Sequence, residues 1–329
     1  MKAGIVFNLK KNPAPDLPDA EAEFDDEETV YAIRDAIEAA GFSAELYEAD
    51  DDLPVRLLQS RPGIVFNIAE GKNGRGREAH VPALCSYLGI PFTGSDETAM
   101  CIAMDKALAK RIAASAGVRT PDYRVVKSGI LPGDPGLSFP LIIKPNSEGS
   151  SKGISNLSIA SDRAGLNRIL EEKMKMYQQD MLLEEYIDGR EFTVGILGNG
   201  DKLRVFPPME IIFGKGTSGI YSYEVKRNFR QHVSYKCPPD INAGQRKEME
   251  TAAETVFRVM ECRDCARIDF RLSAEGRLYF IEINPLPGLA PGYSDFPMLA
   301  EFSGMDYTAL VGCILENALA RYGLNHTMQ

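Results

Sequence analysis

Residues 265–284 place charged and amide side chains in two apolar stretches, and this pattern strongly limits how the chain can fold. An Ala-Glu-Gly turn separates the stretches, so we predict a β-hairpin. Asp269 lies on its first strand, and Glu282 and Asn284 lie on its second. Residues two apart on a strand share a face. Glu282 and Asn284 therefore point the same way, and strand pairing can bring Asp269 opposite them.

These three side chains offer hard oxygen ligands, which suit Mg²⁺ better than zinc or copper. Their apolar neighbours place them on a buried sheet face and argue against an edge hairpin with solvated charges. Arg267 precedes Asp269 by two residues and shares its face, where it can stabilise a developing negative charge. The hairpin is therefore a candidate magnesium site built from Asp269, Glu282 and Asn284.

Composition excludes several other functions. The chain has 329 residues, more than a single core usually holds, so we expect two or three lobes. Its net charge of -10 makes nucleic acid an unlikely partner. No apolar run approaches a membrane span, and the N-terminal apolar stretch is too short for a signal peptide. We therefore expect a soluble, cytoplasmic protein without a membrane partner.

The few histidines and cysteines argue against other catalytic centres. Only three histidines are present, so a mechanism built on a Ser–His or Cys–His pair is not expected. Cys262 and Cys265 form a CxxC, but no second pair or His cluster completes a zinc site. We interpret the six cysteines as structural or incidental thiols.

The first hundred residues alternate between strand and helix. Strands are expected at residues 2–8, 44–47 and 63–67, with a helix from 26 to 40 between the first two. This alternation predicts an α/β lobe with a parallel sheet. A dinucleotide-binding oxidoreductase would share that pattern, but no GxGxxG follows the first strand.

The remainder of the chain mixes the two element types, which predicts an α+β organisation. The expected helices are 78–88, 96–117, 162–178, 244–261 and 306–322. The expected strands are 139–144, 155–160, 181–187, 191–197 and 203–213, in addition to the hairpin. Residues 214–235 are expected to form a long loop.

Two further segments are candidates for nucleotide binding. Lys144 ends a strand that opens into a Gly- and Ser-rich loop, whose backbone N–H groups can bind phosphates, although the Walker A spacing is absent. Lys106 begins a helix and can supply a second positive charge. Residues 182–192 resemble an interdomain hinge that can contact an adenine edge, with Glu191 able to accept from ribose hydroxyls.

In this order and spacing, these segments resemble the ATP-grasp superfamily and, more narrowly, the D-alanine–D-alanine ligases. The matching motifs run from about Pro82 to Met298 and include PFTGSDETAMCIAMDK, PLIIKPNSEGSSKGIS, LLEEYIDGREFTVGIL, YSYEVK, ARIDF and EINPLPG. The resemblance implies an ATP-grasp fold with an N-terminal Rossmann-like domain. Its three lobes would be the substrate domain 1–94, the central lobe 95–183, and the C-terminal lobe 184–329 with a mobile loop at 214–235.

The resemblance also implies an activity. An ATP-dependent carboxylate–amine ligase of this family activates one amino acid as an acyl phosphate, and the amine of a second then displaces phosphate. Amino acids would be the substrates, and a homodimer is expected. ATP and two Mg²⁺ ions, replaceable by Mn²⁺, would be the cofactors. Little acid–base machinery is needed, which agrees with the shortage of histidine.

Residue roles follow from the same resemblance. Phosphate contacts would come from Lys106, Lys144, Ser150, Ser151 and Lys226, and the nucleoside would be held by Glu184, Glu185, Tyr186, Ile187 and Glu191. Asp269, Glu282 and Asn284 would bind the metal ions. Arg267 and the Gly288 backbone would stabilise the oxyanion, with Ser150 and Lys226 also catalytic. Ser294 would meet the carboxylate of the second substrate, although this match requires a one-residue insertion after Asn284.

The first lobe departs from the family pattern. The GG-x-S-x-E motif, whose glutamate grips the first substrate's ammonium, is absent, and Glu27 or Glu28 can serve in its place. The HG-x-x-GEDG motif is replaced by residues 67–78, with Glu70 near the position of its histidine. The tyrosine that usually follows the loop lysine is Arg227. The ATP half is preserved, and the first-substrate half is rewritten.

Two accounts of this change remain open. The first is drift, in which different residues hold D-alanine. The second, which we slightly favour, is a larger or differently charged donor. Glu70 can bind an ammonium group, and Arg75, Arg77 or Arg227 can bind a carboxylate, unless these are solvated loop charges. A nucleotide-binding module without turnover is a third possibility, but the intact set of ATP and metal residues argues against it.

Overall fold

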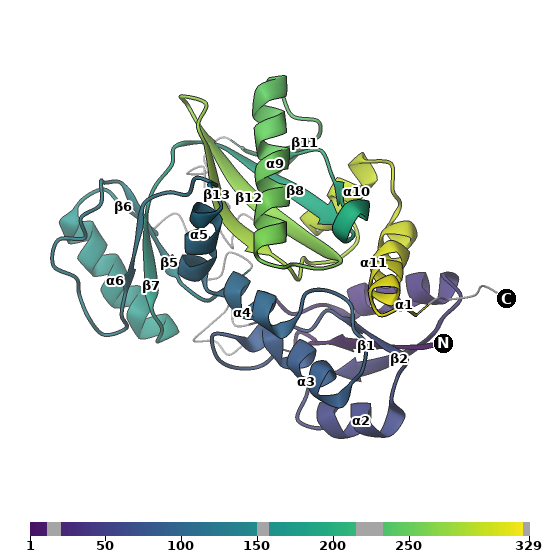
Figure 1. Cartoon of the computed structure of the whole chain (residues 1–329). Helices are drawn as coiled ribbons and strands as arrows, with labels where there is room; N and C mark the ends of the chain where they lie inside the picture. Colours follow the sequence, from purple (N-terminus) through teal and green to yellow (C-terminus); the bar gives the residue numbers. More distant parts are fainter. Residues whose placement is uncertain (12–20, 150–157, 215–232, 325–329) are drawn as a thin grey trace.

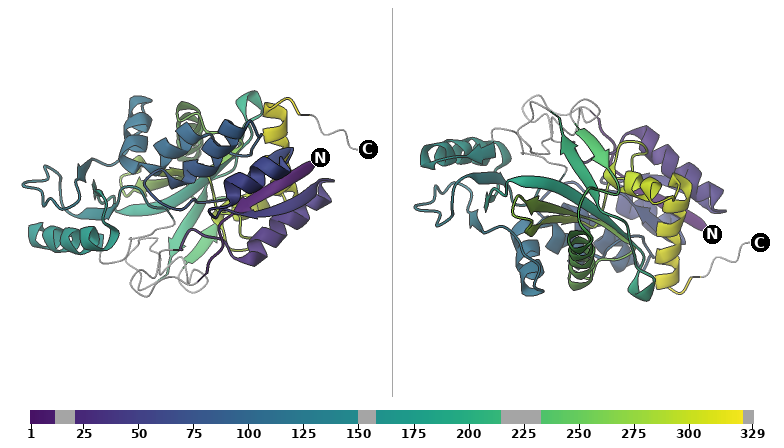
Figure 2. Two further views of the ribbon diagram at one scale, coloured as in Figure 1. Left: turned by 90° about the horizontal axis from the view of Figure 1, so that it is seen from below. Right: turned by 90° about the horizontal axis from the view of Figure 1, so that it is seen from above.

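A computed structural model describes residues 1–11, 21–149, 158–214 and 233–324. Three separate sheets organise these described residues (Figure 1). Figure 2 shows the central lobe extending from one side of the largest sheet, with the N-terminal lobe on the other side. The site discussed below lies where these parts meet.

The first lobe is built on a short parallel sheet of order β2-β1-β3. Its strands are β1 (Lys2–Phe7), β2 (Ser43–Glu48) and β3 (Ile64–Asn67), which confirms the expected alternation. Side chains alternate between the two faces of β1. Ile5 and Phe7 pack with helix α1 (Glu27–Ala39), and Val6 packs in a second cluster with α2 (Leu53–Ser60) and α3 (His80–Leu88). The sequence analysis did not predict α2. The 3₁₀ helix η1 (Arg77–Ala79) directly precedes α3.

The C-terminal helices return to this first lobe. Helices α10 (Asp295–Phe302) and α11 (Tyr307–Arg321) share one apolar cluster with β1 and α1. The final helix was expected, whereas α10, which contains a proline in its first turn, was not. Among the described residues, no single helix has the length and apolar composition needed to cross a membrane, and only α10 and α11, bent by 104°, meet that test as a pair.

The central lobe is an antiparallel sheet of order β4-β7-β5-β6. Its strands are β4 (Tyr123–Val126), β5 (Leu141–Pro145), β6 (Ile159–Ala160) and β7 (Met181–Glu185). Helix α6 (Arg163–Tyr177) packs its apolar side against this sheet. Strand β5 pairs antiparallel with β6, which forms the end of the strand expected at residues 155–160. The first strand, β4, was not expected.

The largest sheet has the order β11-β10-β8-β12-β13, and β9 pairs with β8. Its strands are β8 (Gly189–Leu197), β9 (Arg204–Val205), β10 (Met209–Phe213), β11 (Val233–Lys236), β12 (Cys265–Ser273) and β13 (Leu278–Asn284). The short 3₁₀ helix η3 (Gly200–Lys202) lies between β8 and β9. Most of the loop expected at 214–235 lies outside the described residues, and its described end belongs to β11 instead.

Helices from two distant parts of the chain cover this sheet. Helix α9 (Ala243–Val259) shares an apolar cluster with residues of α4 (Glu97–Met104) and α5 (Lys106–Ser115). Thus α4 and α5 pack on the six-stranded sheet, although they precede the central lobe in the chain. The three lobe boundaries given above stay a prediction.

A buried aspartate joins three of these regions. The Asp264 carboxylate accepts hydrogen bonds from the Gly94 backbone N–H at 2.8 Å, from Asn199 Nδ2 at 2.6 Å and from Arg321 Nη2 at 2.8 Å. Asp264 has a left-handed φ of 63°. It ties the end of the first lobe and helix α11 to the start of β12, next to the predicted metal hairpin.

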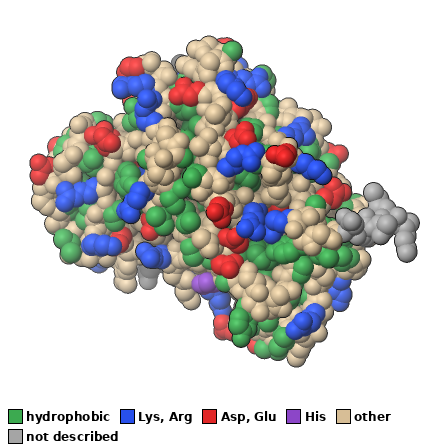
Figure 3. Space-filling view, in the orientation of Figure 1, with side chains coloured by type: hydrophobic (Ala, Val, Ile, Leu, Met, Phe, Trp, Pro, Cys, Tyr) green, Lys and Arg blue, Asp and Glu red, His purple; other side chains and the backbone are tan. Residues whose placement is uncertain are grey.

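Charges of both signs are interspersed on the surface shown in Figure 3. Over the described residues of that face, Lys and Arg side chains lie among Asp and Glu side chains without forming a continuous basic stripe. The exclusion of nucleic acid stays a prediction from composition.

Candidate active site

The predicted hairpin forms as β12 and β13, with its polar residues side by side. Asp269 pairs with Glu282, and Arg267 pairs with Asn284 in the strand register. The register shifts between Asp269 and Phe270. Such a bulge re-aims the side chains beside it. The hairpin therefore brings together the three proposed ligands and the arginine, as expected.

Asp269 lies at the centre of a hydrogen-bond network. Its Oδ1 accepts from Thr193 Oγ1 at 2.7 Å, and Arg267 donates to its two oxygens at 3.1 and 2.9 Å. The Asn284 amide lies 3.3 Å from Oδ2. The Arg267 Nη1 atom is also 3.5 Å from Asp295 Oδ2. Burial opposes charge on Arg267, but Asp269 and Asp295 outweigh it and raise its pKa, so Arg267 remains a fixed cation.

Glu282 is held ionised beside Lys106. The Lys106 Nζ atom lies 3.1 Å from Glu282 Oε2. Burial favours the protonated acid, but Lys106, Lys144 and Arg267 outweigh it and lower the pKa of Glu282 to about 2. A permanently charged carboxylate thus faces Asp269 across the hairpin.

A chain of buried charges lies behind the expected phosphate site. Glu184 Oε2 on β7 is 3.2 Å from Lys144 Nζ on β5 and 2.9 Å from Lys110 Nζ on α5. Lys110 is fully buried and also donates to Thr120 Oγ1 at 2.9 Å. Burial lowers the pKa of Lys110 to about 8 despite the nearby Glu184. The two lysines outweigh burial and lower the pKa of Glu184.

The sequence analysis did not identify Lys110. The only available signal was its position four residues after Lys106, which places both on one helical face. Glu184, expected to frame adenine, instead has its carboxylate engaged by two lysines. Its proposed adenine contact stays untested.

The other nucleoside residues cluster where β7 passes into β8. Glu185 Oε1 accepts from the Ser138 backbone N–H at 2.8 Å, and the Arg271 guanidinium lies 5.0 Å from the Tyr186 ring centre. Ile187 is half-buried between these strands. Glu191 pairs with Arg271 in the register. Burial raises the pKa of Glu191 to about 7, opposed by Arg271 and reinforced by Asp269 and Glu282.

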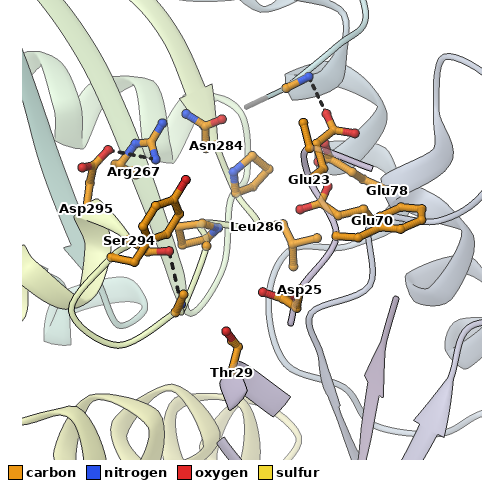
Figure 4. Close-up of a pocket in the computed structure, with 18 of the residues that line it drawn as sticks. Glu23, Asp25, Thr29, Glu70, Glu78, Arg267, Asn284, Leu286, Ser294 and Asp295 are labelled. Carbon is orange, nitrogen blue, oxygen red and sulfur yellow. Dashed lines mark hydrogen bonds and ion pairs between the residues drawn. The ribbon is translucent and has the colours of Figure 1, made fainter. Parts of the chain in front are cut away.

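A cavity of about 470 Å³ separates the hairpin from the first lobe (Figure 4). Arg267, Asn284 and Ser294 lie on its C-terminal wall. At Gly288 a Cβ atom would lie only 2.8 Å from Ser294 Oγ, so a side chain there would require Ser294 to shift. Ser294 Oγ accepts from the Ala290 backbone N–H at 3.2 Å. Lys106, Glu28 and Glu70 line the same cavity, so six residues expected around the reaction centre and substrates meet here with Gly288.

Arg77 connects the first lobe to the start of the Gly/Ser loop. It donates to both Glu23 oxygens, with the two shortest distances at 2.7 Å, and to Glu148 Oε2 at 3.1 Å. It also donates to the Ser147 carbonyl at 2.9 Å, and the Gly149 N–H donates to Glu23 at 2.6 Å. Sequence reasoning missed Glu23. Arg77, considered as a carboxylate-binding residue, is instead saturated by protein groups.

Three more acids lie on this first-lobe wall. The carboxylates of Glu70 and Glu78 lie with that of Glu23 in one group, with oxygens within 4.8 Å of each other. Burial and neighbouring glutamates raise the pKa of Glu70 well above its usual range and that of Glu78 to about 7. Burial likewise raises the pKa of Asp25 to about 7. The wall therefore presents several carboxyl groups to the cavity, and burial favours their protonated forms.

Several expected site residues cannot be placed. Ser150, Ser151, Lys226 and Arg227 lie outside the described residues. Arg75, the other candidate for binding a carboxylate, has a largely exposed side chain 3.6 Å from Asp105 Oδ2. Within the described residues, the first-lobe wall is acidic.

Comparison with known proteins identifies related sequences. Residues 112–316 match the family model described as D-ala D-ala ligase C-terminus. An uncharacterized protein of Sinorhizobium fredii is 33% identical over 295 residues, covering 87% of this chain and 86% of the relative. A D-alanine–D-alanine ligase of Aquifex aeolicus is 33% identical over 294 residues, covering 86% of this chain and 92% of the relative.

Comparison with solved structures identifies the same fold. A D-alanine–D-alanine ligase from Bacillus anthracis complexed with ATP has a TM-score of 0.77 at 21% identity, covering 98% of this chain and 99% of that one. A D-Ala:D-Ser ligase from Enterococcus faecalis has a TM-score of 0.72 at 20% identity, covering 96% and 99%. The fold expected from the motif resemblance is confirmed.

Proposed function

Because this chain belongs to the D-alanine–D-alanine ligase family, we propose that it joins two amino acids through an acyl-phosphate intermediate formed in the cavity between its lobes. Family membership makes it an ATP-dependent ligase that forms a peptide bond. One observation carries the proposal for the site: Arg267, Asn284 and Lys106 converge on one cavity, beside the paired acids Asp269 and Glu282.

The nucleotide would lie between the central lobe and the large sheet. Lys144 and Lys106 come from different elements and provide positive charge near Glu282, as the transfer of a phosphoryl group requires. Lys144 pairs with Glu184, which also pairs with Lys110, so the position of Lys144 is fixed before any ligand binds. Such preorganised charge costs no reorganisation during the reaction.

The metal ligands fit Mg²⁺ by their chemistry. Asp269 and Glu282 face each other across the hairpin, Asn284 adds an amide oxygen, and Glu282 is ionised. This is a hard oxygen set without a sulfur or imidazole donor. Bound Mg²⁺ would neutralise charge on the transferring phosphoryl group. We propose that these three residues hold it.

In the remaining steps, the groups of the protein bind and orient the reactants and do not act as acids or bases. The donor carboxylate attacks the γ-phosphorus, ADP leaves, and the C–O–P linkage makes the carbonyl electrophilic. The acceptor amine attacks that carbonyl, and phosphate departs with the C–O electron pair and takes up the proton that the amine loses. Arg267 and the Gly288 N–H would stabilise the oxyanion between these steps. Ser294 would orient the acceptor carboxylate.

The substrates are proposed from the relatives, which are named D-alanine–D-alanine ligases. D-alanine is therefore the first donor and acceptor to test. A donor other than D-alanine is the second candidate, because Asp25, Glu70 and Glu78 on the first-lobe wall have no described cation at contact distance. A homodimer acting in the cytoplasm stays an expectation from the family resemblance.

The test is ADP and phosphate release with D- and L-amino acids, singly and in pairs. We expect release above the amino-acid-free background only with a productive pair, together with one dipeptide per ADP by mass spectrometry. ATP hydrolysis that no amino acid stimulates would contradict the ligase assignment and favour a nucleotide-binding module.

A further inference from the structure

The two walls of the cavity have opposite chemistry (Figure 4). The C-terminal wall offers Arg267 and Asn284, which suit the carboxylate end of an amino acid. The first-lobe wall offers Glu70, Glu78 and Asp25 instead. A donor amino acid lying across the cavity would therefore direct its carboxylate to one wall and its amino groups to the other.

Cations of the protein near this wall are already paired. Arg77 is engaged by Glu23 and Glu148, and Lys10 Nζ lies 3.1 Å from Asp26 Oδ2. Lys106 lies beside Glu282 on the reaction side. Within the described ranges, this wall therefore has no spare cation to receive a second carboxylate from a substrate, which argues against an acidic donor.

Asp25, Glu70 and Glu78, in contrast, have no cation at contact distance among the described residues. Glu78 is 9% exposed, lines the cavity, and makes no hydrogen bond or ion pair with another described residue. Glu70 and the Asp25 carboxylate likewise accept no hydrogen bond from the residues that the structure places. Glu78 is buried and Asp25 and Glu70 are half-buried, and carboxylates in such places normally have hydrogen-bond donors. A ligand that brings several N–H donors would satisfy all three.

We propose that the donor is an amino acid with a second cationic group, an amine or a guanidine on its side chain. Its α-ammonium and side-chain cation would share Asp25, Glu70 and Glu78. An alanine donor supplies only one cation to these three acids. This inference rests on the proposed function, because it is the ligase reaction that places the donor carboxylate near Arg267.

The first experiment identifies the donor. ATP-dependent product formation is measured with pairs drawn from D- and L-alanine, lysine, ornithine, 2,4-diaminobutyrate, arginine and glutamate. The donor is the N-terminal residue of the dipeptide, which tandem mass spectrometry identifies. We expect a basic amino acid at that position, with kcat/KM at least about 100-fold above that of alanine, because a site built for polar groups rejects analogues that lack them.

The second experiment assigns the recognition to the wall. Glu70→Gln and Glu78→Gln should each raise the KM for the basic donor about 10- to 100-fold, as loss of a charge-assisted hydrogen bond does, while the KM for ATP changes little. Asp25→Asn tests the same wall from another segment if either variant fails to fold. Glu38→Gln removes an exposed first-lobe carboxylate from helix α1 and should leave all constants unchanged.

The outcomes separate this inference from the proposed function. Dipeptides with N-terminal alanine, and none with a basic donor, would overturn the inference and leave the ligase assignment intact. Saturable Mg²⁺ binding that Glu70→Gln and Glu78→Gln both abolish, with alanine as donor, would assign the wall to a metal ion and also overturn it. No dipeptide from any pair would instead count against the proposed function.

Discussion

The ATP side of the site and the first-lobe wall of the cavity differ in how their charges are balanced. On the ATP side, Glu282 faces Lys106, Asp269 faces Arg267, and Glu184 faces both Lys144 and Lys110. On the first-lobe side, Arg77 pairs with Glu23 and Glu148, whereas Asp25, Glu70 and Glu78 have no described cation at contact distance. The ion pairs of the ATP side hold its charged side chains in place without a ligand. The first-lobe wall, in contrast, has carboxyl groups that a cationic ligand can pair with.

This difference follows from the supporting elements. Asp269, Glu282 and Thr193 lie on neighbouring strands whose register fixes their spacing. Glu70 lies in a loop after β3, and Glu78 lies in the 3₁₀ helix η1. Chemistry shared across a family can stay on the strands, while loops change to suit a substrate.

The largest expected effect concerns the ATP side of the site. Asp269→Asn removes one proposed metal ligand and a partner of Arg267, so we expect kcat for ATP-dependent phosphate release to fall at least about 1,000-fold, with the fold retained. Steady-state phosphate release and thermal unfolding measure the two properties. Glu275→Gln, at the exposed turn of the same hairpin, is the control and should retain activity. Near wild-type turnover of Asp269→Asn would refute the metal assignment.

A smaller effect tests whether the ion pairs of Glu184 stabilise the ATP side of the site. Lys110→Met leaves the buried Glu184 with Lys144 as its one contacting lysine among the described residues. Breaking such a pair should lower the free energy of unfolding by about 3 kcal/mol, measured by urea denaturation. The exposed pair of Lys127 and Asp180 provides the control: Lys127→Met should cost less than about 1 kcal/mol. Equal losses in the two variants would contradict this interpretation.

The smallest effect concerns pH and the first-lobe wall. The pKa of Asp25 is about 7 in the folded state, raised by burial from 3.8. Between pH 4 and 7 the folded protein therefore retains a proton that the unfolded chain has lost, and wild-type stability declines as pH rises through this window.

Asp25→Asn removes that titration. The decrease in the free energy of unfolding between pH 5 and pH 8 should be smaller in the variant by about 1 kcal/mol, because partial exposure screens the charge. Urea denaturation at both pH values measures it, and Glu38→Gln should behave as the wild type. A larger pH dependence in Asp25→Asn than in the wild type would show that the carboxylate is stabilised in its charged form.

Much of the fold was predictable because its signals are local. The alternation over residues 2–67 predicted β1, α1, β2 and β3, and the two apolar stretches around 274–276 predicted the hairpin. Elements without a clear periodic signal were missed: α2, β4 and α10 are short, and α2 and α10 contain proline. Helix α5 was expected, but not its position on the large sheet.

The sequence by itself determined the hairpin, and it predicted the metal ligands proposed there and the use of ATP. Asp269 and Asn284 are 15 positions apart in the sequence, and Glu282 lies between them. The strand period and one turn therefore suffice to bring the three side chains together. Only the tertiary structure decided the first-lobe wall. Arg77 meets Glu23 and Glu148 across 54 and 71 residues, and Glu23 meets Gly149 across 126. No local pattern encodes contacts at such separations, because they depend on how the first lobe folds and on how it packs against the central lobe.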